Sequence, residues 1–247
     1  MTSVKESSLL FAGEMVRAIV REVDPKTQTR RALLPQPAAA AILPRHWSET
    51  LQRRKTPGIY GGDGTVLGNV PMADGTWGDV CCPYGLPGDR IYVKETFFAW
   101  GRWETRFSAK KGRDEWHFVD MTLEAGKAYL YAADGNGPAT KKRQSSILPA
   151  WWKRPAIFMP RVASRILLEV TEVRVERLQD ISEADARAEG VADGGCTSCG
   201  MPEPCGCPTP LPSARDAFAH LWMSINGPDS WAVNPSVWAV SFRRIAT

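Results

Sequence analysis

Residues Ser164–Val175 (SRILLEVTEVRV) carry the clearest strand pattern in the chain. Apolar side chains alternate with outward-facing positions from Ile166 to Val170, and the alternation resumes at Val173. A period of two places one face of a strand against a core. We therefore predict that this stretch is a central β-strand.

Weaker patterns on both sides of this strand complete the expected fold. Ser182 and Ser213 each precede an acidic residue by three positions, which is typical of a helix start. We predict further strands over residues 9–11, 91–94, 127–132 and 237–242, and helices over residues 13–21, 184–189 and 214–225. Short strands, few helices and turn-rich connections indicate an α+β protein that is mainly β, with helices packed outside a small β-barrel.

The composition excludes several classes of protein. The 247 residues are 43% hydrophobic, enough for a core, and a formal charge of +4 is far from that of a nucleic-acid-binding tail. Basic residues nevertheless occur in short clusters along the sequence, which are typical either of a phosphate-binding surface or of a solvated face. The N-terminus does not resemble a signal peptide and no segment is apolar for about 20 residues, so we expect a soluble, intracellular protein without membrane contact.

The stretch Lys26–Arg31 (KTQTRR) is the densest group of reactive side chains. It places an amine, two hydroxyls and two guanidinium groups just beyond the predicted helix that Pro25 ends. These groups could bind phosphate, or the hydroxyls could cap a turn. A role in chemistry is the third interpretation, which the rest of the chain favours for Lys26.

Several segments together resemble the ASCH family of phage- or prophage-encoded type, whose fold is similar to that of PUA domains in RNA-modifying proteins. The resemblance covers about half of the chain, in the expected order, and rests on LLFAGEMVRAIV with KTQTRR, CPYGLPGDRIYVKET, MPRVASRILLEVTEVRVERLQDISEADARAEGV, ARDAFAHLWMSING and WAVNPSVWAVSFRRI. The chain departs from the family at Asp24-Pro25, where many members have a glycine two residues before the lysine. The resemblance implies one PUA-like domain over residues 1–247, with long loop insertions at about 32–79, 99–157 and 193–212.

The resemblance also implies catalytic residues, because small bacterial members of the family hydrolyse the amide of acetylcytidine. Lys26, Thr29 and Glu189 match the lysine, threonine and glutamate that carry that chemistry. In one division of labour a neutral Lys26 activates the Thr29 hydroxyl, which requires burial or the charges of Arg30 and Arg31 to lower the lysine pKa. In the other, Glu189 activates water while Lys26 stabilises the oxyanion.

Substrate or phosphate contacts are expected from Thr27, Arg30, Arg31 and Glu95, with Gln28 as a spacer. Glu95 could equally form a cross-strand ion pair. Four tryptophans could stack on bases, although most tryptophans are core residues: Trp103, Trp116, Trp151 and Trp152.

Four cysteines lie close together at Cys196, Cys199, Cys205 and Cys207. Four thiolates suit a closed structural zinc site, whereas the single residue between the last two strains a tetrahedral shell, so free thiols are the alternative. Such a site would leave no open position for catalysis, and we expect no catalytic cofactor.

The sequence leaves three hypotheses about the function open. The first is a hydrolase that acts on an acylated or modified pyrimidine nucleoside or base, or on nucleic acid that contains it. The second is a non-catalytic RNA- or DNA-binding module that recognises a modified base, and the third is a nuclease. The expected partners are therefore RNA, DNA or a modified nucleoside, and the expected location is the cytoplasm of a bacterial host cell.

Overall fold

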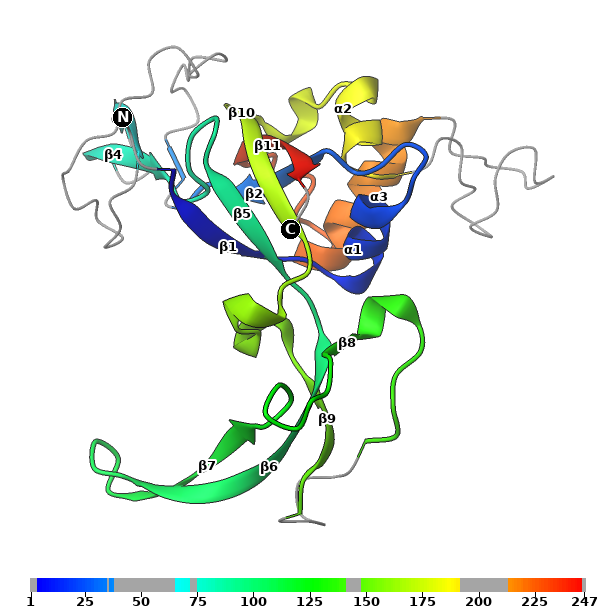
Figure 1. Ribbon diagram of the computed structural model, residues 1–247. Coiled ribbons are helices and arrows are strands. Elements are labelled where there is room, and N and C mark those ends of the chain that lie inside the picture. Colours follow the sequence, from blue (N-terminus) through cyan, green and yellow to red (C-terminus); the bar gives the residue numbers. More distant parts are fainter. Residues whose placement is uncertain are drawn as a thin grey trace. The chain divides into compact units, whose positions relative to one another are not determined.

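The computed structural model describes residues 4–34, 36–37, 65–71, 75–140, 148–191 and 213–245. Contacts within the chain divide it into two compact units (Figure 1). Unit 1 comprises Met1–Ser8, Ala18–Ile91 and Ile166–Thr247, and unit 2 comprises Leu9–Arg17 and Tyr92–Arg165. The arrangement as one domain with insertions stays a prediction.

A five-stranded sheet has the strand order β1-β5-β10-β11-β2. Its strands are β1 (Glu6–Leu10), β5 (Arg90–Lys94), β10 (Leu167–Arg177), β11 (Ser236–Ile245) and β2 (Gln28–Ala32). β11 runs antiparallel to both β10 and β2. The predicted central strand is confirmed as β10, and β11 lies inside the sheet as its apolar sequence indicated. A separate pair, β3 (Thr65–Pro71) and β4 (Trp77–Cys82), is also antiparallel.

Three α-helices occur in the described residues, close to the predicted ranges: α1 (Gly13–Val20), α2 (Glu183–Ala188) and α3 (Ala214–Asn226). Both serine caps are confirmed, since Ser182 Oγ accepts from the backbone N–H of Asp185 and Ser213 Oγ from that of Asp216, each at 3.1 Å. α2 and α3 lie side by side (Figure 1). They share an apolar cluster with the start of β11: Leu178, Ile181, Ala186, Ala214, Phe218, Trp222 and Val237.

Unit 2 is built around β6 (Phe97–Ser108). β6 pairs antiparallel with β7 (Arg113–Asp120), β8 (Leu130–Tyr131) and β9 (Ala150–Arg154), and with β7 it forms the long ribbon in Figure 1. Its core is Phe97, Ala99, Met159 and Ala163. Short 3-10 turns in the two units span Ala132–Asp134, Ala156–Phe158, Arg161–Ala163 and Leu178–Asp180.

The fold class is α+β and mainly β, as predicted, but two details differ. In the described residues β1 and β2 are opposite edges of one open sheet, so the strands do not close into the expected barrel. The segment 32–79 was expected to be a loop insertion but contains β3 and part of β4, and the segment 99–157, expected likewise, contains most of β6 and all of β7 to β9. Its aromatic side chains pack across the strands, which a sequence pattern read strand by strand misses.

Gly101 allows β6 and β7 to approach each other closely. A Cβ atom at this position would overlap the carbonyl oxygen of Val119 and lie 2.8 Å from Phe118 Cζ. Backbone atoms of a paired strand cannot move away without breaking the ladder, so only glycine fits here.

We predict that Gly101→Ala destabilises the protein by about 1–3 kcal/mol, because the added methyl group forces β7 away from β6. Gly13→Ala is the control, since a Cβ at Gly13 would have no neighbour closer than 3.6 Å. Urea unfolding followed by circular dichroism measures both. Equal unfolding midpoints for the two variants would contradict the close approach.

Candidate functional site

Backbone hydrogen bonds fix the segment that carries the predicted lysine. The N–H of Lys26 donates to the carbonyl of Ala18 at 2.8 Å, and the N–H of Thr27 donates to that of Ala188 at 2.8 Å. The carbonyl of Thr27 accepts from the N–H of Phe242, also at 2.8 Å. The chain entering β2 is therefore held by α1, α2 and β11 at once.

Lys26 and Glu189 form a buried ion pair. Lys26 Nζ lies 2.6 Å from Glu189 Oε2 and also donates to the backbone carbonyl of Glu189 at 2.7 Å. The two side chains are 0% and 2% exposed. Two residues separated by 163 positions, which the sequence analysis assigned to one site, are thus in direct contact.

Gly190 makes this contact possible. It follows Glu189, which ends α2, and has φ of +90°, a conformation that glycine adopts readily. A Cβ atom there would lie 2.9 Å from Ala18 Cβ and 3.0 Å from Lys26 Cβ. The end of α2 can approach the lysine only because this position has no side chain.

Arg30 is the counterion at the second carboxylate oxygen of Glu189. Its Nη1 donates to Glu189 Oε1 at 3.2 Å, and its Nε donates to Glu176 Oε1 at 2.9 Å. Asp185 Oδ2 lies 3.4 Å from Nη2. The side chain of Arg30 is fully buried, and its charge is balanced by carboxylates from β10 and α2.

Gln28 extends this network and is more than the spacer we expected. Its Nε2 donates to Asp185 Oδ1 and to Ser241 Oγ, both at 3.1 Å. Arg174 Nη2 donates to the same oxygen of Asp185 at 3.1 Å. Burial tends to raise the pKa of Asp185, but Arg174, Arg30 and this amide outweigh it and hold that pKa below its usual value.

These side chains form what we call the charged layer: Lys26, Gln28, Arg30, Arg174, Glu176, Asp185 and Glu189. It lies between one face of the sheet and α2.

Thr29 points to the opposite face of β2. Side chains alternate along a strand, and Thr29 lies between Gln28 and Arg30, which both contact the charged layer. Thr29 is fully buried opposite Val240, and its Oγ1 has no hydrogen-bond partner in the described part of the chain. The structure therefore brings Glu189, but not the Thr29 hydroxyl, to Lys26.

The pKa of Lys26 lies below its ordinary value. Burial is the largest cause, the carboxylate of Glu189 opposes it, and the positive charges of Arg31 and Arg30 lower the pKa further. The arrangement therefore favours loss of the proton from Lys26 compared with a lysine in water.

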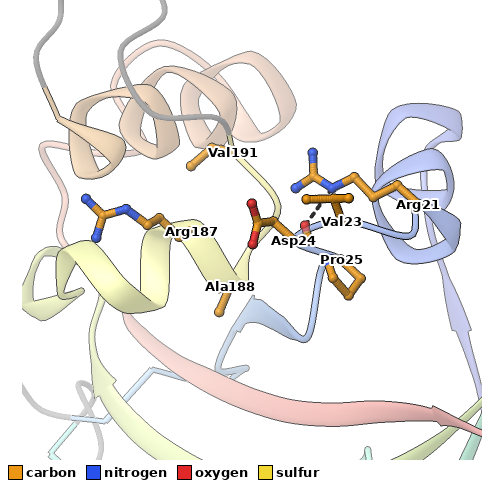
Figure 2. Close-up of a pocket in the computed structure, with 7 residues that line it drawn as sticks. All are labelled: Arg21, Val23, Asp24, Pro25, Arg187, Ala188 and Val191. Atoms are coloured by element: carbon orange, nitrogen blue, oxygen red, sulfur yellow. Dashed lines mark hydrogen bonds between the residues drawn. The ribbon is translucent and has the colours of Figure 1, made fainter.

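A pocket of about 530 Å³ lies next to the residues that precede Lys26 and Glu189 in the chain (Figure 2). It is lined by Arg21, Val23, Asp24, Pro25, Arg187, Ala188 and Val191. Pro25 directly precedes Lys26, and Ala188 directly precedes Glu189, so the backbone of the pair continues into the pocket wall.

Arg21 links two segments of the pocket wall through hydrogen bonds. Its Nε donates to the carbonyl of Asp24 at 2.6 Å and its Nη2 donates to that of Gly190 at 3.2 Å. In Figure 2 the guanidinium of Arg187 points away from Asp24, and its Nη2 lies 3.7 Å from Glu183 Oε2. Asp24 has φ of +47°, in the left-handed region that few residues other than glycine, asparagine and aspartate adopt.

The other predicted contacts are distributed differently. Thr27 is exposed and Arg31 is half-buried. Glu95 lies in unit 2, where it is buried and accepts hydrogen bonds from Arg165 Nε at 2.9 Å and Nη2 at 3.2 Å; this is an ion pair, but both residues lie outside the strands. Burial raises the pKa of Glu95 while Arg165 opposes that rise.

The predicted zinc ligands Cys196, Cys199, Cys205 and Cys207 lie outside the described residues. Within the described ranges no group of three or more metal-binding side chains occurs. No described helix has the length and apolar character needed to cross a bilayer.

Arg21, Asp24 and Arg187 were not predicted from the sequence. Two of them could have been proposed from their position in the sequence, because Asp24 lies two residues before Lys26 and Arg187 lies two residues before Glu189. Comparisons with protein-family models, with curated proteins and with solved structures gave no match.

We predict that Glu189→Gln costs about 3–5 kcal/mol of stability, because it leaves the buried Lys26 without a counterion. Lys26→Met should cost less, since Glu189 keeps Arg30. Arg243→Ala is the matched control because its ion pair with Glu169 is solvent-exposed and worth at most about 1 kcal/mol. Chemical denaturation measures all three, and similar losses for Glu189→Gln and Arg243→Ala would contradict the buried pair.

We predict that Thr29→Val is neutral or stabilises the protein by up to about 1 kcal/mol. The valine replaces a buried hydroxyl that makes no hydrogen bond with a methyl group of the same shape. Thermal unfolding measures the change. A loss of more than about 1 kcal/mol would mean that the hydroxyl has a partner.

Proposed function

We propose that the protein hydrolyses an amide on an acylated pyrimidine nucleoside or base, with Lys26 as the base and then the acid, and Glu189 as the carboxylate that holds it in place. The observation that carries the proposal is the 2.6 Å contact between these two buried residues, whose chain neighbours Pro25 and Ala188 line a pocket. The resemblance to the ASCH family supports the same pair, because both residues match the lysine and glutamate that carry the chemistry in that family.

The charges around Lys26 suit a proton acceptor. If Lys26 loses its proton, Glu189 keeps Arg30 as a counterion at 3.2 Å, so the buried layer does not become strongly unbalanced. A neutral Nζ can take a proton from water as the water oxygen attacks the amide carbonyl. The C–N bond then breaks, and the proton returns from Nζ to the departing amine, which leaves a carboxylic acid and an amine.

Water, rather than Thr29, is the nucleophile in this proposal. Thr29 lies on the other face of β2 and its hydroxyl is not hydrogen-bonded to Lys26. A serine or threonine nucleophile needs a base within hydrogen-bond reach.

The pocket supports a nucleoside-sized ligand. Its volume of about 530 Å³ falls in the range of small-molecule sites, roughly 300–1,000 Å³. Asp24 can accept hydrogen bonds from a base or sugar, while Arg187 can donate them. Lys26 and Glu189 are buried. Pro25 and Ala188 in the pocket wall must therefore move apart before a substrate can reach Lys26 Nζ.

Recognition without catalysis is the second candidate. It is favoured by the completeness of the ion pair, since Nζ already has two acceptors and both carboxylate oxygens of Glu189 have donors. In that case the charged layer only supports the pocket, and Arg21, Asp24 and Arg187 hold a modified base or nucleotide.

The decisive experiment incubates purified protein with acetylcytidine and a panel of acylated pyrimidine nucleosides, followed by chromatography. We expect turnover whose rate rises with pH, because Lys26 must lose its proton, and then levels off. Lys26→Met should lower the rate by about 10²–10⁴-fold. Thr29→Val and the control Arg243→Ala should retain it, and circular dichroism checks that each variant is folded.

Two outcomes contradict the proposal in different ways. Loss of turnover in a folded Thr29→Val variant would restore the threonine as nucleophile. No turnover on any compound, together with salt-sensitive binding of nucleotides, would contradict hydrolysis and support recognition without catalysis.

A further inference from the structure

One face of the β6–β7 hairpin carries a row of aromatic side chains. Trp103 pairs with Phe118 in the strand register, so the two share a face. Phe107 is four residues beyond Trp103, and Trp116 two residues before Phe118, which places both on that same face. We call these four residues the aromatic face.

The exposure of these side chains increases toward the turn of the hairpin. Trp103 and Phe118 are partly buried, whereas Trp116 is 46% exposed and Phe107 is 69% exposed. Large aromatic side chains gathered on an exposed sheet face are typical of interaction surfaces.

Cations lie within and beside this row. The guanidinium of Arg154 lies 4.4 Å from the ring centre of Phe118 and 4.9 Å from that of Trp103. Exposed Lys110 and Lys111 form the turn that follows β6. The surface therefore offers flat rings and positive charge together.

The opposite face of the hairpin is different. There Glu104 pairs with Arg102 at 3.5 Å and with Arg106 at 2.8 Å, so that face presents ion-paired charges in place of exposed aromatic rings. Glu115 on the same face accepts from Lys111 at 2.8 Å. The two faces thus differ in chemistry: the exposed rings of Trp116 and Phe107 lie on one face only, which also carries the carboxylate of Asp114 opposite Phe107.

The charge of the chain is concentrated in unit 2. Its sequence contains 15 Lys and Arg against 8 Asp and Glu, a formal charge of +7. Unit 1 has the remaining 16 against 19, a formal charge of −3. An anionic partner is favoured at unit 2, whereas a second copy of the same surface would be repelled.

We propose that the aromatic face binds single-stranded nucleic acid. Bases stack on Trp116 and Phe107, and phosphates lie near Lys110 and Arg154. Stacking needs bases whose flat faces are accessible, which a duplex does not offer. A membrane surface is less suited, because the turn that would enter it is Lys110-Lys111-Gly112 rather than apolar.

Fluorescence anisotropy of labelled oligothymidylate and oligouridylate, about 12 nucleotides long, tests this proposal with the full chain. We expect binding of at least one of them that weakens with salt, by about 0.7 in logarithmic slope for each phosphate contact. Lys110→Ala should reduce that slope.

The aromatic residues are tested by Trp116→Ala with Phe107→Ala, which should weaken binding by about 10-fold or more. Trp116→Phe should retain most of the affinity, because it keeps a ring. Val233→Ala is the matched control, since Val233 is 70% exposed and lies in unit 1. All these variants leave the pocket and the charged layer unchanged, so hydrolysis of a free nucleoside should not alter.

Four results would overturn the proposal: no binding of either oligonucleotide below about 100 μM; binding that the aromatic variants do not weaken; tighter binding to duplex DNA or to anionic vesicles than to single strands; or concentration-dependent self-association that the same variants abolish. None of them bears on the hydrolase.

Discussion

The burial of Lys26 against Glu189 is the constraint on which unit 1 depends. Taking two charges out of water is expensive, and their attraction offsets the cost only when every oxygen and proton is satisfied. Here Arg30, Gln28 and the Glu189 carbonyl complete the contacts. Meeting that requirement needs α1, α2, β2 and β10 in place at once, so elements distant in sequence must fold as one unit.

Much of this arrangement could be predicted from sequence. The serine caps of α2 and α3 and the central strand β10 depend on local patterns, and they were found where expected. The pairing of Lys26 with Glu189 followed from a resemblance, because no local rule connects residues 163 positions apart. The direction of Thr29 was missed because KTQTRR was interpreted as one cluster, whereas a strand sends alternate side chains to opposite faces.

Unit 2 was harder to predict for a different reason. Gly101 and the aromatic residues of β6 act through their partners on β7 and β9, and those partners cannot be assigned without the register. A single strand such as β6, with an Arg, Glu or Thr between aromatic residues, also resembles a polar loop. The concentration of positive charge in this unit was visible in the sequence only after its boundaries were known.

The two faces of β2 also restrict how that strand can pair with β11. A slip of one residue would turn Gln28 and Arg30 toward the apolar side that Val240 and Trp238 share, and would send Thr29 into the charged layer. An uncompensated guanidinium in that core would cost several kcal/mol. The buried charges thus select one strand alignment among the alternatives, whatever chemistry they perform.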